Sequence, residues 1–252
     1  MSRLILGIQP VREAIKVLGG SIERVFIQGE GGPKLEALAR YAETRGIGIE
    51  RLPRNELDRR SSGGRHQGVL AMGPELKLWS IDTLTVNASS VVVALDGVMD
   101  PQNFGAIVRT SVALGACAIV WPEHSSAPLS PATFRASAGA IEHAVLCRVG
   151  SLPEALARLA ARGVTPIALD ARGPMELGEL DLHGPVALVI GSEDKGARRP
   201  VRLACKHVAR LPMRGPIASL NASVAAGIAL YEIVRQRQDT SPIAAVPEGE
   251  CD

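Results

Sequence analysis

The sequence predicts an α/β protein in which a small N-terminal α/β unit precedes a larger domain built on a parallel sheet. From residue 91 onward, wholly apolar segments of strand length alternate with segments of helical periodicity, as expected for parallel strands covered by helices on both faces. Residues 1–75 form a separate compositional unit. A polar segment that includes Asn87-Ala88-Ser89-Ser90 suits a linker between the two.

The N-terminal unit is predicted to hold two helices and three strands. Apolar side chains spaced three and four residues apart from Leu35 to Ala42 mark an amphipathic helix. The predicted helices span residues 11–18 and 33–45, and the predicted strands span residues 25–27, 47–52 and 69–72. The unit therefore covers residues 1–75, and the linker covers residues 76–90.

The second domain, residues 91–238, is predicted to alternate strands and helices. Its first strand, residues 91–95, carries no polar side chain, which is typical of a strand buried on both faces. The other predicted strands span residues 117–121, 144–148, 164–169, 186–190 and 207–211, and the predicted helices span residues 103–114, 152–161 and 219–237. Residues 239–252 contain two prolines and several acids and are predicted to be a disordered tail.

Composition narrows the function classes. The chain has 252 residues, of which 46% are hydrophobic, and no apolar run reaches the roughly 18 residues of a membrane span. The first residues do not form a secretory leader, so a cytoplasmic protein is expected. Four cysteines stand far apart without a Cys-x-x-Cys pair, which argues against a metal site and against disulfides. Neither a complete phosphate-binding loop nor a Gly-x-Gly-x-x-Gly dinucleotide motif is present.

A first polar cluster runs from Asp100 to Arg109. Asn103 precedes a helical pattern, so its simplest role is helix N-cap. Gly105 would let another backbone or a ligand come close. Arg109 lies on an otherwise apolar helix, where its cation must either reach water or meet an anion such as RNA phosphate.

Two more polar clusters follow predicted strands. Residues 191–196 come directly after the strand at residues 186–190, and ligands bind at the carboxyl ends of strands in open α/β sheets. A solvated loop is the alternative for this charged segment. Residues 211–216 form the second loop, which leads to Ser219, a suitable N-cap for the last helix. That helix places Leu220, Val224, Ile228 and Tyr231 on one stripe, which suits either an interior helix or a subunit contact.

Residues 51–66 carry five arginines and a histidine against two acids. None of the seven aromatic residues of the chain lies in this stretch, so it lacks platforms for stacking unpaired bases. The stretch is either a solvated loop or a surface that binds RNA through phosphates and shape.

Together, the three clusters resemble the signature motifs of the SpoU (TrmH-like) branch of the SPOUT RNA 2'-O-ribose methyltransferases, from about residue 91 to residue 237. The resemblance implies a C-terminal SPOUT domain with a parallel sheet and a deep trefoil knot, S-adenosylmethionine as cofactor, and a homodimer. It implies a catalytic set of Asn103, Arg109, Glu193, Ser219 and Asn221, and a cofactor set of Gly191, Leu211, Met213 and Leu220. No metal or membrane is implied.

The N-terminal unit resembles the L30e-like RNA-binding domain of bacterial 23S rRNA guanosine-2'-O-methyltransferases, including their His-Gln-Gly-Val signature at residues 66–69. This resemblance implies an RNA partner, 23S rRNA, with contacts from Arg54, Arg59, Arg60, Arg65 and His66. Gln9 and Asp194 depart from the family pattern, which bears on the particular nucleotide. The alternatives are a tRNA enzyme, an antibiotic-site rRNA methyltransferase and a non-catalytic RNA-binding assembly factor.

The implied reaction is attack of a ribose 2'-hydroxyl on a sulfonium methyl group, with most of the rate gain coming from near-attack geometry. A guanidinium keeps its proton in nearly all protein settings. Arg109 is therefore expected to orient the ribose and stabilise the developing alkoxide, and the group that removes the proton is left unassigned.

Overall fold

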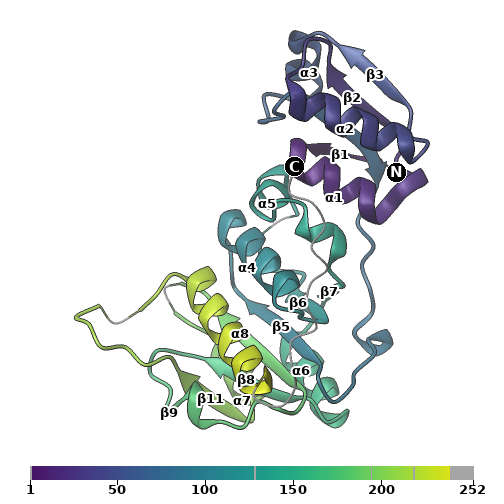
Figure 1. Ribbon diagram of the computed structural model, residues 1–252. Helices are drawn as coiled ribbons and strands as arrows, with labels where there is room; N and C mark the ends of the chain where they lie inside the picture. The colour runs from purple at the N-terminus through teal and green to yellow at the C-terminus, as the bar shows by residue number, and fades with distance from the viewer. Residues whose placement is uncertain (1, 128, 194, 218, 239–252) are drawn as a thin grey trace.

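The computed structural model describes residues 2–127, 129–193, 195–217 and 219–238. It contains a four-stranded sheet in the N-terminal part and a seven-stranded sheet in the rest of the chain. Figure 1 shows the smaller sheet with its helices above the larger one, joined by a long segment that runs down one side. The predicted tail, residues 239–252, lies outside the described residues.

The N-terminal sheet is mixed, with strand order β1-β4-β2-β3. Strand β4 pairs antiparallel with β1 and β2, whereas β2 and β3 are parallel. The predicted strands and helices are present, and the sequence analysis missed β1 and α3. The elements are β1 (Ser2–Leu6), α1 (Ile8–Leu18), β2 (Arg24–Gln28), α2 (Pro33–Thr44), β3 (Ile49–Leu52), α3 (Arg54–Arg60) and β4 (Val69–Pro74).

All neighbouring strands of the larger sheet are parallel, as predicted, and the strand order is β7-β6-β5-β10-β8-β11-β9. Its strands are β5 (Val91–Asp96), β6 (Ala118–Pro122), β7 (Leu146–Val149), β8 (Thr165–Leu169), β9 (Met175–Glu176), β10 (Val186–Gly191) and β11 (His207–Arg210). Its helices are α4 (Pro101–Ala113), α5 (Pro131–Ala136), α6 (Leu152–Ala161), α7 (Arg199–Leu203) and α8 (Ala222–Gln238).

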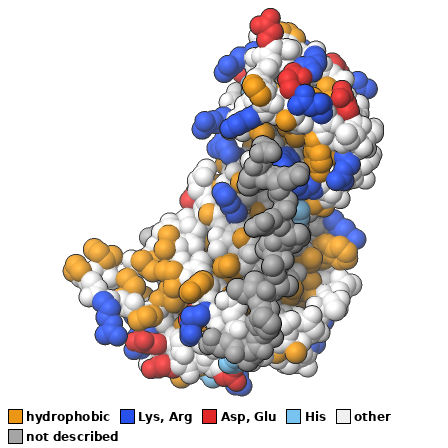
Figure 2. Space-filling view, viewed as in Figure 1, with side chains coloured by type: hydrophobic (Ala, Val, Ile, Leu, Met, Phe, Trp, Pro, Cys, Tyr) orange, Lys and Arg blue, Asp and Glu red, His pale blue; other side chains and the backbone are white. Residues whose placement is uncertain are grey.

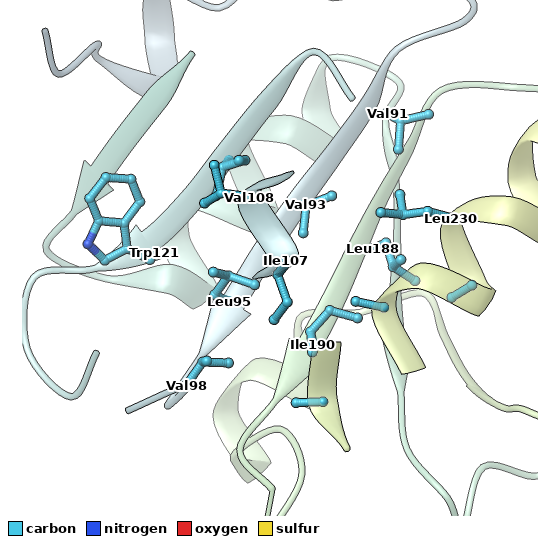
Figure 3. Packing of buried hydrophobic residues seen from close by; sticks show 14 of the residues in the cluster. Val91, Val93, Leu95, Val98, Ile107, Val108, Trp121, Leu188, Ile190 and Leu230 are labelled. Atoms are coloured by element: carbon cyan, nitrogen blue, oxygen red, sulfur yellow. The ribbon is translucent and has the colours of Figure 1, made fainter. Parts of the chain in front are cut away.

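Helices cover both faces of this sheet, and alternate residues of its central strands point to opposite faces. Val93 and Leu95 of β5 pack toward α4 and α8 on one face. Figure 3 shows Ile107 and Val108 of α4 beside these two strand residues. Val92 and Ala94 belong to the opposite cluster, which contains residues of α6 and α7. The apolar strands predicted from sequence are thus covered on both sides.

Two helix starts differ from the sequence prediction. Helix α4 begins at Pro101, since Asp100 caps it by accepting from the backbone N–H groups of Gln102 and Asn103. Asn103 is therefore not the N-cap, and its side chain is available for other contacts. Helix α8 begins at Ala222, and the Asn221 side chain, rather than Ser219, accepts from the early backbone N–H of Ser223.

The segment between the two sheets, residues 75–90, contacts the larger sheet and its helices. Trp79 donates a backbone hydrogen bond of 2.8 Å to the carbonyl of Leu146, at the start of β7. Residues 81–83 then form a 3₁₀ turn, and Arg158 of α6 pairs with Asp82 there at 3.0 Å. The segment therefore adds an edge contact to the larger sheet.

Candidate functional site

A cavity lies at the carboxyl ends of β8, β10 and β11 and at the start of α8. Its volume is about 360 Å³, within the range of small-molecule sites. This is the edge of a parallel sheet at which open α/β folds bind ligands. The lining residues are Leu169, Asp170, Ala171, Arg172, Ile190, Gly191, Ser192, Glu193, Lys195, Gly196, Leu211, Met213, Ser219, Leu220, Ala222 and Ala225.

The structure brings together all four residues that the sequence suggested for cofactor binding: Gly191, Leu211, Met213 and Leu220 line this one cavity. Leu211 and Met213 come from the loop after β11, and Leu220 lies immediately before α8. The end of β10 therefore meets residues that follow β11 and residues that precede α8 at one cavity.

Gly191 lies where the chain turns back on itself. Ser192 and Gly196 exchange backbone hydrogen bonds of 2.9 and 3.2 Å, which hold these two residues side by side after β10. A Cβ on Gly191 would lie 2.0 Å from the backbone N of Ala197. No side chain fits there, so the glycine is required for this loop to pack against the end of β10.

Three polar side chains from separate motifs form one hydrogen-bonded cluster. The Nδ2 of Asn103 donates to Oε1 of Glu193 at 2.5 Å, and its Oδ1 accepts from Nδ2 of Asn221 at 2.9 Å. Asn103 is 9% exposed and lies in the first turn of α4. Glu193 also lines the cavity, so the cluster adjoins it directly.

The other two predicted catalytic residues have different positions. Ser219 lines the cavity. Arg109 is exposed on α4, does not line the cavity, and makes no ion pair with any residue that the structure describes. The next residue of α4, Thr110, packs against Gly227 of α8.

Sequence reasoning missed two acids at strand ends. Asp170 follows β8, lines the cavity with a side chain that is 8% exposed, and accepts a backbone hydrogen bond from Arg172. Asp96 ends β5 fully buried and accepts from the backbone N and Nε of Arg198 at 2.7 and 2.8 Å. An acid that closes an otherwise apolar strand was the available signal for both.

Most of the predicted RNA contacts lie on or after α3. Arg54, Arg59, Arg60 and Arg65 are exposed. Glu56 holds Arg59 and Arg60 with hydrogen bonds of 2.8–3.0 Å, and those bonds lower the pKa of the Glu56 carboxyl to about 2. Arg54 and Arg65 make no ion pair within the described part of the chain.

His66, in contrast, is buried and makes hydrogen bonds within its own domain. Its ring is 5% exposed, its Nδ1 accepts from the backbone N of Gly68 at 3.0 Å, and its Nε2 lies 2.8 Å from Oδ1 of Asp58. Because Nδ1 is an acceptor, the proton belongs on Nε2, which donates to Asp58. Both ring nitrogens are occupied, so a direct RNA contact by His66 does not fit this geometry.

Comparisons with known proteins assign the two parts of the chain separately. Residues 90–231 match the model of the SpoU rRNA methylase family, and residues 4–79 match the model of an RNA 2'-O ribose methyltransferase substrate-binding domain. The chain belongs to the SpoU rRNA methylase family. The methyltransferase class predicted from the three motifs is thereby confirmed.

Relatives of the SpoU chain cover nearly its whole length. It is 37% identical to an uncharacterised tRNA/rRNA methyltransferase of Mycolicibacterium vanbaalenii, over 94% of this chain and 77% of that protein. The SpoU methyltransferase AviRb of Streptomyces viridochromogenes, solved with S-adenosylmethionine, matches at 26% identity with a TM-score of 0.79, over 94% of this chain and 90% of that one.

A second solved structure is the rRNA methyltransferase of Sinorhizobium meliloti bound to S-adenosylmethionine. It matches this SpoU chain at 27% identity with a TM-score of 0.77, over 93% of this chain and 87% of that one. The α/β fold with an N-terminal domain and the S-adenosylmethionine dependence of the family agree with the sequence predictions. Among the described residues, no three His, Cys, Asp or Glu side chains group as a metal site, and no helix is long and apolar enough to cross a membrane.

Proposed function

We propose that this SpoU enzyme transfers a methyl group to the ribose 2'-hydroxyl of a guanosine in 23S rRNA. The observation that carries the proposal is the Asn103–Glu193–Asn221 cluster, whose members come from three separate motifs and adjoin one cavity. Such a cluster has little structural use in a protein that only binds RNA. The proposed substrate also supports a cytoplasmic location.

The cavity fits S-adenosylmethionine. Apolar side chains of Leu211, Met213 and Leu220 form one wall, and Gly191 lines the same cavity. The carboxylates of Asp170 and Glu193 also line the cavity, and acids complement the positive sulfonium of this cofactor. When bound, the cofactor supplies an activated methyl group.

The chain's own residues position the acceptor. We assign Asn103 to hold Glu193 and Asn221 in fixed orientations, so that the ribose meets a preorganised set of donors and acceptors. Ser219 supplies a hydroxyl at the cavity wall. Arg109 is assigned to orient the ribose and stabilise developing negative charge on its 2'-oxygen, for which a permanently protonated guanidinium is suited.

Ribosomal RNA is favoured by the N-terminal domain, whose residues 4–79 match a substrate-binding model. Its arginines, Arg54, Arg59, Arg60 and Arg65, are exposed and suited to phosphate contacts. We propose an L30e-like RNA-binding role for this domain.

We further propose a homodimer that meets through α8. Val224, Ile228 and Tyr231 are 49%, 44% and 59% exposed, whereas Ala226 and Ala229 on the other side of the helix are buried. Figure 2 shows hydrophobic side chains gathered over this part of the molecule. Thr110 packs against Gly227 of this helix, and we propose that its neighbour Arg109 acts at the contact between the two copies. The trefoil knot of the family is part of the same proposal.

Two measurements test the function. Calorimetry on chelator-treated protein is expected to show binding of S-adenosylmethionine, and no binding at millimolar cofactor contradicts the proposed site. Mapping of 2'-O-methyl groups in rRNA from cells with and without this protein is expected to reveal one guanosine of 23S rRNA whose methylation depends on it. If the rRNA map is unchanged and a methyl group is lost from tRNA, the substrate is tRNA and not rRNA.

A further inference from the structure

The N-terminal domain is docked against the catalytic domain through a built contact. Strand β1 and helix α1 touch α5 and the 3₁₀ turn at Ala140–His143. An ion pair and a hydrogen-bond contact cross this junction: Arg3–Glu142 at 2.5 Å, and His143 Nε2 to Oε2 of Glu13 at 2.8 Å. A connection made only by the linker would show neither contact.

Arg3 is the centre of the junction. Its side chain is 11% exposed, and that of Glu142 is 2% exposed. The Nε of Arg3 donates to the carbonyl of Pro74 at 3.0 Å, and its guanidinium lies 5.2 Å from the ring centroid of Phe134. One side chain thus contacts β4 of its own domain and both α5 and the 3₁₀ turn of the other. A buried charge held by such contacts is costly to leave unpaired.

Gly139 allows helix α1 and the catalytic domain to come into close backbone contact. It adopts φ +88°, and a Cβ on it would lie 2.8 Å from Cβ of Glu13 and 2.9 Å from Cα of Pro10. Helix α1 therefore lies directly against the backbone of this turn. A residue with a side chain would be strained there and would push the two domains apart.

Helix α5, which contacts the N-terminal domain, also packs directly against α4. A Cβ on Gly105 of α4 would lie 2.5 Å from Cβ of Ala136 and 2.6 Å from the carbonyl O of Thr133, both in α5. Helix α5 therefore packs tightly against α4, which carries Asn103 and Arg109. The N-terminal domain therefore rests on α5, and α5 packs against the helix that bears the proposed catalytic residues.

We infer that Arg3, Glu142 and Gly139 are specificity-determining positioning residues that hold the RNA-binding domain at a fixed distance from the methyl-transfer cavity. RNA bound to the arginines at and after α3 then presents one nucleotide to the cavity. A loose tether would lower the effective concentration of that nucleotide and let its neighbours enter. The inference rests on the proposed function, because it needs an RNA substrate.

The variants are Arg3→Ala, Glu142→Ala and Gly139→Ala, compared with Asp82→Ala. Asp82 belongs to an exposed ion pair with Arg158 away from the junction, so its loss is a matched control. The readouts are small-angle scattering of the full chain, S-adenosylmethionine affinity, RNA affinity, and the distribution of methyl groups along the RNA.

We expect the three junction variants to enlarge the radius of gyration, to lower kcat/KM for RNA by about tenfold or more, and to place methyl groups on nucleotides next to the normal one. Cofactor and RNA affinities should stay near wild type, as should every readout of the control. Arg3→Lys keeps a cation opposite Glu142, so it should restore much of the single-site methylation and show that the Ala variants did not merely misfold.

The inference is overturned if the folded junction variants methylate only the normal nucleotide at wild-type efficiency. It is also overturned if their scattering curves match that of wild type. A wild-type enzyme that transfers no methyl group to any RNA would instead defeat the proposed function, and scattering would still decide whether the junction holds the domains together.

Discussion

At the scale of single residues, Asn103 is suited to its position because a primary amide can donate and accept at once. Its Nδ2 donates to the Glu193 carboxylate, which only accepts when ionised, and its Oδ1 accepts from the Asn221 amide. A carboxylate in its place could satisfy Asn221 but not Glu193. The cluster is therefore specific for the amide at this position.

Asn103→Asp tests this argument. The new carboxylate would lie at hydrogen-bond distance from Glu193, and two adjacent carboxylates raise the pKa of one of them. We expect turnover at pH 8 to fall by about a hundredfold, the scale of one lost preorganised contact. Part of the activity should return as the pH falls and the pair takes up one proton. A pH–rate profile identical to that of wild type would contradict the role of the cluster.

Arg109 offers a second test at this scale. It is exposed and makes no ion pair among the described residues, so Arg109→Ala should leave the melting temperature and cofactor affinity nearly unchanged. Turnover should fall by about a hundredfold or more, if its cation stabilises the alkoxide. Arg109→Lys keeps the charge but loses the planar fork. Steady-state kinetics showing near wild-type turnover for Arg109→Ala would make it an ordinary surface arginine.

At the scale of elements, the loop after β10 depends on the absence of a side chain at Gly191. Gly191→Ala would force the loop away from the backbone of Ala197, at a cost of about 1–3 kcal/mol in the free energy of unfolding. Calorimetry should show S-adenosylmethionine affinity falling at least tenfold. Gly184→Ala is the control, since a Cβ there meets no atom within 4 Å. Equal cofactor affinities in the two variants would show that Gly191 does not contribute to cofactor binding.

Helix α3 provides a test of the RNA surface. Glu56 binds both Arg59 and Arg60, and those bonds lower its pKa to about 2, so its carboxylate stays charged at every pH at which the enzyme is used. Glu56→Gln should release Arg59 for phosphate contacts and weaken the hold on Arg60, which also lies 3.9 Å from Glu50. We expect tighter RNA binding and a steeper dependence of the binding constant on salt concentration, measured by fluorescence anisotropy. An unchanged salt slope would mean that neither arginine contacts RNA.

Sequence patterns predicted the elements that bury an apolar face and missed those that do not. Six strands of the larger sheet and α6 were found because their apolar side chains follow a regular pattern, whereas the two-residue strand β9 was missed. Helix α3 was missed because, of its seven residues, only Leu57 is buried. The α4 and α8 starts were misplaced because several residues before each helix can act as a cap, and only the packed chain shows that Asp100 and Asn221 do so.

At the scale of the whole molecule, the motifs predicted which residues would line the cavity but not how the domains are joined. Gly191, Leu211, Met213 and Leu220 carry local signals, such as a glycine after an apolar strand. The contact of Arg3 with Glu142 spans 139 residues and joins two otherwise ordinary charged side chains. No local pattern marks such a pair, because its energy depends on burial that only the docked domains create.

The exposed stripe of α8, Val224, Ile228 and Tyr231, is expected to form the contact between two copies of the chain. Ile228 and Tyr231 would be buried between two copies, so Ile228→Glu with Tyr231→Glu would place unpaired charges in an apolar contact. We expect sedimentation equilibrium to show a dimer for wild type and a monomer for the double variant. Val17→Glu, at a similarly exposed apolar residue of α1, should remain dimeric. RNA methylation should fall with dimer content, because Arg109 is proposed to act at the contact between the two copies; a fully active monomeric variant would contradict that role.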